Sequence, residues 1–149
     1  MNRLKQNRAA SFIAVTFVYI LATVVGVLAY RALTVEWWLA LLIADAVATV
    51  ATFAFSLLFR NASVYDPYWS VQPPVILATF AIGTELTALG VMLLVAVFFW
   101  GLRLTANWVY TFHGLNHQDW RYTMLKEKTG VFYPFINFVG IHMVPTLVV

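Results

Sequence analysis

The chain contains no cysteine and few charged residues: only 10% of its 149 residues are Asp, Glu, Lys or Arg. The lack of cysteine excludes a disulfide framework and a cysteine-based metal site. Soluble domains carry about 25% charged residues, whereas 62% of this chain is hydrophobic. The composition therefore excludes an ordinary soluble domain and predicts a helical membrane protein.

Patterns that hold phosphate or activate a nucleophile are also missing. The seven glycines are isolated, so they form neither a GxGxxG motif nor a P-loop. No serine stands in a nucleophile elbow. A bound nucleotide would therefore have to be held by side chains, by loops or by sequence beyond Val149. The nine Lys and Arg residues are scattered rather than clustered, which favours membrane lipid over nucleic acid as a partner.

Apolar runs of span length follow one another along the chain. A bilayer-crossing helix needs about 20 predominantly apolar residues. The predicted fold class is all-α, a polytopic transmembrane helical bundle of about five spans that forms a single membrane domain over residues 1–149. We expect the spans at residues 11–30, 37–59, 67–83, 86–110 and 131–149, with a cytoplasmic loop over 111–130. The last run is still apolar at Val149, so we expect this chain to be the N-terminal part of a longer protein.

The basic residues predict the orientation, because cytoplasmic loops carry an excess of Lys and Arg. With the N-terminus in the cytoplasm, Arg31 alone lies outside and Arg103 lies in the cytoplasmic half of its span. The other basic residues are then all cytoplasmic: Arg3, Lys5, Arg8, Arg60, Arg121, Lys126 and Lys128. We expect an integral protein of the bacterial plasma membrane.

Polar residues share one face of the second span. Asp45, Thr49, Thr52 and Ser56 follow at i, i+4, i+7 and i+11. The hydroxyls favour a structural role, bonding back to helix carbonyls or to a neighbouring helix. Asp45 is open to two interpretations, an acid satisfied by a neighbour or the wall of a polar cavity.

A second stripe lies on the fourth predicted span, where Arg103, Asn107 and Tyr110 are spaced i, i+4 and i+7. Arg103 either snorkels to the interface or pairs with Asp45 or Asp66, and the stripe favours a cavity-lining face. A weaker stripe on the first span (Thr16, Tyr19, Thr23 and Gly26) predicts close helix packing.

The histidines do not predict a metal site. His113 and His117 are spaced i and i+4, but Gly114 and Asn116 disfavour a rigid helix between them. His142 lies five residues after Asn137, a spacing that does not place the two on one face of an α-helix. We expect His142 to be a satisfied interior residue.

The most polar stretch between spans is SVYDPYWSVQPP, residues 63–74. Asp66 is a favoured N-cap and Pro67 fits the first position of a helix. Pro73 and Pro74 then fall inside the third span, where we expect them to kink or break it. This structural interpretation leaves Asp66 as the residue that calls for a further role.

Three motifs in this region, NASVYDPYWSVQPP, WGLRLTANWVY and GLNHQDWRY, resemble in order and spacing an uncharacterised prokaryotic membrane family of the steroid 5-alpha-reductase-like superfamily. They span residues 61–122. The resemblance implies a multi-pass reductase that uses NADPH to reduce a carbon–carbon double bond conjugated to a carbonyl in a lipophilic small molecule.

The resemblance also implies site residues. Asp66 is similar to the acid that holds the substrate carbonyl, although the better-understood members have Glu, and it is the expected catalytic residue. The family's substrate-binding tyrosine has no clear counterpart here. The expected substrate-binding residues are Asp45, Tyr65, Tyr68, Trp69, Arg103, Asn107 and Tyr110. Arg121, or alternatively Arg103, is the expected contact to the NADPH phosphates on the cytoplasmic side, and a positive-inside anchor is the other interpretation of Arg121. The superfamily's main Arg-His-Pro-Asn-Tyr cofactor motif is absent from this chain.

Two other functions stay open from the sequence. One is a membrane methyltransferase of similar helical build that acts on a lipid or prenyl group. The other is a non-catalytic membrane scaffold or small transporter that uses the Asp45 stripe.

Overall fold

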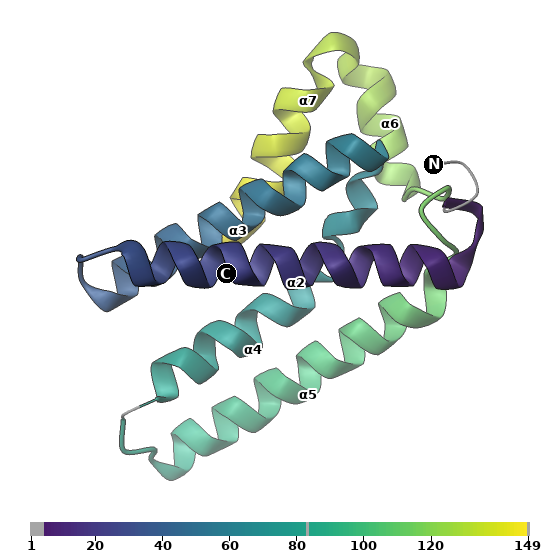
Figure 1. Ribbon diagram of the computed structural model, residues 1–149. Helices are drawn as coiled ribbons and strands as arrows, with labels where there is room; N and C mark the ends of the chain where they lie inside the picture. Colours follow the sequence, from purple (N-terminus) through teal and green to yellow (C-terminus); the bar gives the residue numbers. More distant parts are fainter. Residues whose placement is uncertain (1–4, 83, 149) are drawn as a thin grey trace. The chain divides into compact units, whose positions relative to one another are not determined.

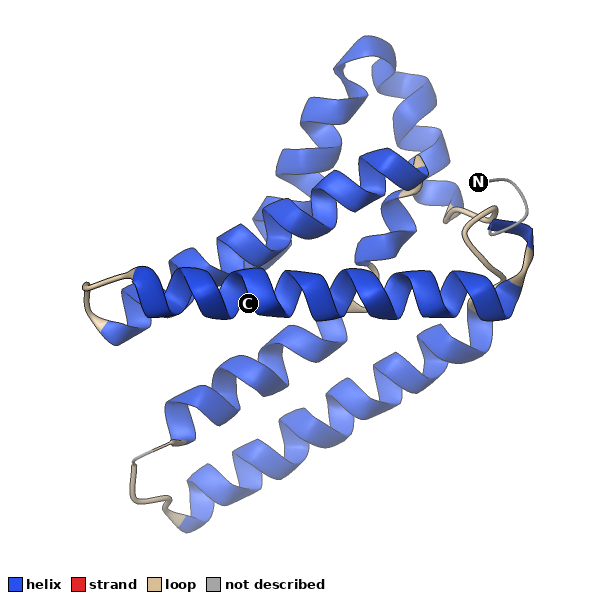
Figure 2. Ribbon diagram, viewed as in Figure 1, coloured by secondary structure: helices blue, strands red, loops and turns tan. Residues whose placement is uncertain are grey.

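The computed structural model describes residues 5–82 and 84–148, and within them every regular element is helical (Figure 2). The all-α prediction is therefore confirmed. Three predictions concern residues outside the described part of the chain: the cytoplasmic position of Arg3, and the span ends at Gly83 and Val149. The contacts within the chain group it into two units, Met1–Tyr65 with Phe112–Val148, and Asp66–Thr111.

The described residues include four stretches that are long and apolar enough to cross a membrane. Three are the helices α2 (Arg8–Ala32), α3 (Trp37–Phe59) and α5 (Ala88–Thr111), close to the predicted spans. The fourth runs over Trp120–Val148. The predicted third span corresponds to α4 (Tyr68–Ala81), whose 14 residues are fewer than the roughly 20 that a span needs.

Helices α2 and α3 are the two long helices of the first unit, and they pack side by side (Figure 1). Small residues allow the close approach: a Cβ at Gly26 would lie 3.3 Å from the Ala44 oxygen and 3.4 Å from the Ala48 Cβ. The packing stripe predicted on α2 was only partly right, because Thr16 and Thr23 are exposed. The buried face of α2 is instead Ser11, Val15, Val18, Ala22 and Gly26.

The remainder of the first unit is formed by the chain from Phe112 onward. Residues predicted as a loop include a helix, α6 (Trp120–Thr129), which begins at the N-cap Asp119 and ends at Gly130, where φ is +51°. At Gly130 the chain turns, so that α7 (Tyr133–Ile136), reached through the short 3₁₀ turn η2 (Gly130–Phe132), returns beside α6 (Figure 1). A π-helix, η3 (Asn137–Met143), and α8 (Val144–Val148) then pack on α3.

The second unit is a helical hairpin of α4 and α5. Gly101 is the contact point, since a Cβ there would lie 2.5 Å from the Ser70 oxygen and 2.8 Å from the Pro74 Cγ. The Ser70 and Thr105 hydroxyls add a hydrogen bond of 2.8 Å between the helices. Pro73 and Pro74 do not break α4, contrary to the stronger form of the prediction.

The start of α4 also differs from the prediction. Pro67, not Asp66, occupies the N-cap position, and its φ of −68° and ψ of −16° are already helical. The reason is local: a 3₁₀ turn, η1 (Ala62–Tyr65), leads directly into the turn at 66–67, and the chain is already helical at Pro67.

Candidate functional site

The segment after α3 is fastened to the loop before α6 by the side chain of Asn61. Its Nδ2 donates to the Leu115 oxygen at 2.9 Å and to the His117 oxygen at 3.0 Å. Its Oδ1 accepts from the Ser63 N–H at 2.9 Å. Asn61 is 2% exposed, and this one amide bonds three main-chain groups of the two segments.

Two further hydrogen bonds close the same junction. The Gln118 Oε1 accepts from the Ala62 N–H at 3.1 Å, and the Ser63 Oγ accepts from the Asp119 N–H at 3.0 Å. The segments NASVY and GLNHQD, which belong to two of the resembling motifs, therefore contact each other directly. We call this junction, residues 61–63 with 115–119, the clasp.

The N-terminus of α2 is tied to the same end of the unit. The Lys5 ammonium donates to the Phe59 carbonyl at the end of α3. The Ser11 Oγ accepts from the Leu115 N–H at 3.0 Å. Gly114, with φ of +115°, fits here because a Cβ would lie 2.9 Å from the Lys5 oxygen.

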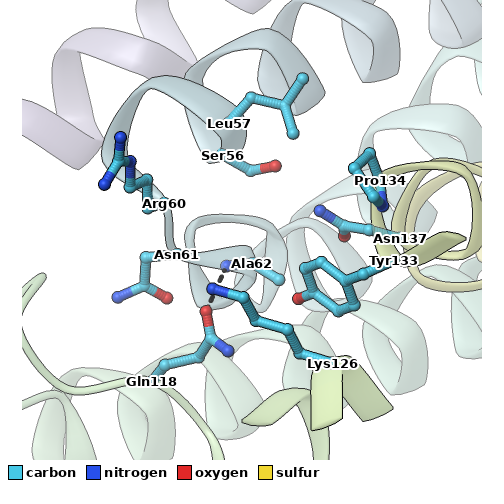
Figure 3. A pocket seen from close by; sticks show the side chains of 10 residues that line it. All are labelled: Ser56, Leu57, Arg60, Asn61, Ala62, Gln118, Lys126, Tyr133, Pro134 and Asn137. Atoms are coloured by element: carbon cyan, nitrogen blue, oxygen red, sulfur yellow. Dashed lines mark hydrogen bonds between the residues drawn. The ribbon is translucent and has the colours of Figure 1, made fainter. Parts of the chain in front are cut away.

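A cavity of about 250 Å³ opens beside the clasp (Figure 3). Residues from the end of α3, the clasp, α6, α7 and η3 surround it: Ser56, Leu57, Arg60, Asn61, Ala62, Gln118, Lys126, Tyr133, Pro134 and Asn137. Two of them, Arg60 and Lys126, are cations, and no carboxylate is among these described lining residues. The cavity is therefore suited to an anion.

Arg60, one of the lining residues, has an unusual backbone conformation. With φ of +51° and ψ of +42°, it closes α3 in the left-handed conformation, and the Asn61 N–H bonds back to the Ser56 oxygen at 2.9 Å. Glycine is the usual residue in this motif. A side chain there costs about 1–2 kcal/mol of backbone strain, so this position favours a functional reason for arginine.

One polar atom at the cavity, the Asn137 Oδ1, is shielded from solvent and has no hydrogen-bond partner within the described residues. The Tyr133 hydroxyl is also shielded from solvent, and it interacts with the side chain of Gln118. Asn137 is 2% exposed, and Figure 3 shows its amide extending toward the Ser56 side of the cavity. Buried polar groups are nearly always bonded in folded proteins, so the Asn137 oxygen calls for a bound group.

Behind the cavity, Thr146 is the centre of a buried hydroxyl network. Its Oγ1 donates to the His142 carbonyl at 2.9 Å. Because a hydroxyl has one proton, Thr146 must accept from the Tyr65 hydroxyl at 2.7 Å and from the Thr49 hydroxyl at 2.8 Å. The Tyr65 proton is thus committed to Thr146. Burial, with the charge of Asp45 adding to it, raises the pKa of Tyr65 to about 12, so the phenol is neutral.

His142 lies against this network and is fully buried. Its ring packs on Tyr65 with the centroids 4.4 Å apart. The Nδ1 lies 3.1 Å from the Asn137 carbonyl, which can only accept, so Nδ1 carries the proton. The Nε2 is consequently an acceptor, and it has no partner within the described residues. The expectation of a fully satisfied histidine is wrong for this atom.

Comparison with known families adds one decisive match. A family model described as a protein of unknown function, DUF1295, covers residues 52–149, more than half of the chain. The chain belongs to the DUF1295 family. No curated protein and no solved structure matches it.

The DUF1295 match includes the clasp, the cavity and all of the Thr146 network except Thr49, and these features all belong to the first unit. Of the predicted site residues, three belong to this unit. Asp45 is half-buried on α3, Tyr65 is buried in the network, and Arg121 is exposed. Arg121 forms an ion pair of 2.8 Å with Asp119, on the side of α6 that does not line the cavity.

The other predicted residues belong to the second unit of this DUF1295 chain. Asp66 is half-buried and Tyr68 is buried, whereas Trp69 is 43% exposed. On α5, the stripe of Arg103, Asn107 and Tyr110 is exposed along its whole length. The cavity-lining role of this stripe stays a prediction.

The hydroxyls of α3 have the structural roles that were predicted. The Thr52 Oγ1 donates to the Ala48 oxygen at 3.0 Å, and the Ser56 Oγ donates to the Phe53 oxygen at 2.9 Å. Thr49 bonds to Thr146 on the neighbouring helix. Among the described residues no group of three or more His, Asp or Glu is arranged to hold a metal ion.

Sequence reasoning missed the cavity residues for identifiable reasons. Arg60 and Lys126 have the pattern of ordinary cytoplasmic anchors, and Tyr133 has that of an interfacial aromatic residue. Asn137 was the sequence feature that pointed to the cavity, since an amide inside an apolar run requires a hydrogen-bond partner.

Proposed function

We propose that this chain contributes its helices to a multi-pass membrane reductase of the steroid 5-alpha-reductase-like superfamily, which uses NADPH to reduce a lipophilic enone. The observation that carries the proposal is the basic cavity of the first unit, placed at one end of span-length apolar helices. A polar, cationic cavity suits a nucleotide, and apolar helices suit a lipophilic substrate. DUF1295 membership is consistent with the resemblance of the three motifs.

The cavity fits part of the cofactor. Pockets for small molecules are typically about 300–1,000 Å³, so a cavity of about 250 Å³ suits a phosphate-bearing end rather than a whole dinucleotide. In this proposal Arg60 and Lys126 hold the phosphate, and NADPH supplies the hydride. Arg121 is a poorer candidate for this role than the sequence indicated, because Asp119 already occupies its guanidinium.

Asp66 is the proposed acid. Hydride addition to the β-carbon of an enone places negative charge on the carbonyl oxygen, and a protonated carboxyl group can stabilise that charge with a hydrogen bond or a proton. Asp66 lies directly before Pro67, the N-cap residue of α4, and is half-buried.

The proposed orientation places the cavity on the cytoplasmic side, where NADPH is available. Four residues predicted to be cytoplasmic gather at one end of the first unit: Lys5 at the Phe59 carbonyl, Arg8 in the first turn of α2, and Arg60 and Lys126 at the cavity. Arg31 lies in the last turn of α2, at its other end. Reporter fusions before Arg8 and after Arg31 test this orientation, since only the first should report the cytoplasm.

The activity test uses the full-length gene product purified in detergent. We expect lipophilic enones to drive NADPH oxidation, and Asp66→Asn to lower kcat by about 100-fold or more, the scale of general acid catalysis. The matched control is Glu85→Gln, an exposed acid of the same unit, which should keep full turnover. Stabilisation and methyl transfer with S-adenosylmethionine, without NADPH oxidation, would replace the reductase by the methyltransferase alternative.

A further inference from the structure

The hairpin of α6 and α7 is poorly covered by the rest of the first unit. Residues 120–136 all belong to the described chain, and none of them is buried. A Cβ added at Gly130, in the bend of the hairpin, would meet nothing of the described protein within 4 Å beyond its neighbours along the chain. Figure 1 shows the two helices extending away from α2 and α3, with this bend at their far end. The hairpin therefore contacts its surroundings rather than a protein core.

The bend of the hairpin is apolar. Val131 is 89% exposed, Phe132 is 69% exposed and Phe135 is 67% exposed. Bare apolar surface that lies together in this way is unfavourable in water and marks a contact with a membrane or another molecule. The described chain does not supply that contact.

Helix α6 carries charge up to the same bend. Its ten residues include three basic side chains and one acidic side chain. Arg121 is paired with Asp119, and the Lys126 ammonium lies 5.9 Å from the centroid of the Tyr133 ring on α7. Lys128 is exposed and forms no ion pair with a described residue. A helix with these charges is costly to place in the hydrocarbon centre of a bilayer.

One exposed face of α6 combines an aromatic, an apolar and a basic side chain. Trp120, Met124 and Lys128 are spaced i, i+4 and i+8, which places them on one side of the helix, and all three are exposed. A lysine can lay its stem on apolar surface while its ammonium reaches the lipid headgroups. Aromatic and apolar residues together with lysine are typical of a helix that lies in the plane of the membrane interface.

We propose that the α6–α7 hairpin lies along an anionic lipid surface. Val131 and Phe132 enter the boundary between headgroups and acyl chains, Trp120 and Met124 lie at the same depth, and the Lys128 ammonium contacts lipid phosphates. The interface accommodates both parts of the hairpin, because water disfavours the apolar bend and the hydrocarbon centre disfavours the charged helix.

The charge at this end of the first unit favours anionic over zwitterionic lipid. Six basic residues against two acidic ones leave an excess of four positive charges. Every lysine or arginine near an anionic surface adds to the attraction. The residues are Lys5, Arg8, Arg60, Arg121, Lys126 and Lys128, with Asp119 and Glu127.

The test compares the membrane depth of the two ends of α6. The 149 residues contain no cysteine, so Trp120→Cys and Phe132→Cys each provide one position among them for an environment-sensitive fluorophore. The full-length protein, freed of any other cysteine, is placed in nanodiscs. Aqueous iodide and lipids that carry a spin label near the headgroup or near the chain end serve as quenchers. Because the ten residues of α6 extend over about 15 Å, an upright helix would separate the two depths by about that length.

We expect both labels to be quenched most by the spin label near the headgroup, at equal depth. Phosphatidylglycerol in place of half of the phosphatidylcholine should lower the iodide quenching of the label at position 132. Lys128→Gln should reverse most of this change, because one lysine near an anionic surface shifts the partition of the hairpin by about fivefold. The matched control is Arg31→Gln, an exposed basic residue at the other end of α2, which should leave the quenching unchanged.

Four results would overturn the proposal. Quenching at position 132 mainly by the spin label near the chain end would place the bend in the bilayer centre, as part of a span. Quenching by iodide alone would place it in water, and protection from every quencher would show that a protein segment covers it. A shallow depth that ignores both phosphatidylglycerol and Lys128→Gln would exclude the anionic lipid. None of these readouts depends on NADPH oxidation, so the hairpin and the reductase proposals stand or fail separately.

Discussion

The Asn61 side-chain amide lies 2.9 Å from the carbonyl oxygen of Leu115, 54 residues further along the chain. Through this bond and its partner to His117, the end of α3 and the approach to α6 are held together at one edge of the cavity. The position of Arg60, the neighbour of Asn61, depends on this clasp.

Asn61→Ala should destabilise the protein by about 1–3 kcal/mol, because it leaves the buried Leu115 carbonyl and its neighbours without a donor. The unfolding midpoint in a denaturing detergent titration measures this loss. Asn116→Ala, an exposed amide of the same loop, is the control and should stay within about 0.5 kcal/mol of the unmodified protein. Equal effects of the two variants would contradict the role of the clasp.

Thr146→Val should cost more stability than Tyr65→Phe. The valine leaves two buried hydroxyls, those of Tyr65 and Thr49, without their acceptor, at about 1–3 kcal/mol. The phenylalanine removes one donor and leaves the bond between Thr49 and Thr146 in place, at about 1 kcal/mol. Thermal unfolding of the two variants checks the order, and a reversed order would refute the direction of these bonds.

Gly101→Ala should separate α4 from α5, because the new methyl group would lie 2.5 Å from the main-chain oxygen of Ser70. Overpacking of this kind costs about 1–3 kcal/mol. Gly90→Ala on the same helix is the matched control: its nearest neighbour would lie 3.5 Å away, so we expect a gain of about 0.5–1 kcal/mol from helix propensity. A disulfide formed between cysteines placed at positions 70 and 105 would report the separation directly, as slower oxidation in Gly101→Ala.

Asp119 should stabilise the protein in a pH-dependent way. The Arg121 side chain, hydrogen-bonded to it, lowers the pKa of Asp119 below its usual value, and the Arg121 N–H adds to this effect. A group whose pKa is lower in the folded state stabilises above its unfolded pKa, near 4, and the stabilisation is lost as the pH falls through the folded pKa.

The variants Asp119→Asn and Asp119→Ala separate the charge from the helix cap. Asparagine keeps an oxygen for the Arg121 N–H, so we expect a loss of less than about 1 kcal/mol at pH 7. Alanine also removes the cap, at about 0.5–2 kcal/mol. Thermal unfolding at pH 7 and pH 3 should show the difference between the unmodified protein and the Asp119→Asn variant shrinking at low pH. A difference that is constant with pH would show that the charge contributes nothing.

The long helices were predictable because hydrophobicity dominates them. The ends of α3 agree with the predicted span to the residue, and α2 and α5 agree within three. The clasp was not predictable, since hydrogen bonds between residues such as Asn61 and Leu115 depend on tertiary folding. Lys126 was missed for a different reason: nothing in its local sequence separates it from Lys128.

The spacing of Asn137 and His142 shows where helix periodicity misleads. Five residues place two side chains on different faces of an α-helix, yet both are buried here. The chain forms a π-helix over Asn137–Met143, in which the i and i+5 positions come together, and the His142 Nδ1 bonds to the Asn137 carbonyl. Such single wide turns are frequent at functional sites, and this one carries the Asn137 amide to the cavity.

The hydrogen bonds of the network around Thr146 all run in one direction. The His142 carbonyl is the terminal acceptor, so the protons of Thr146, Tyr65 and Thr49 all point the same way, toward it. Tyr65 therefore enters this network as a donor to Thr146. One main-chain oxygen therefore sets the direction of the whole row of hydroxyls.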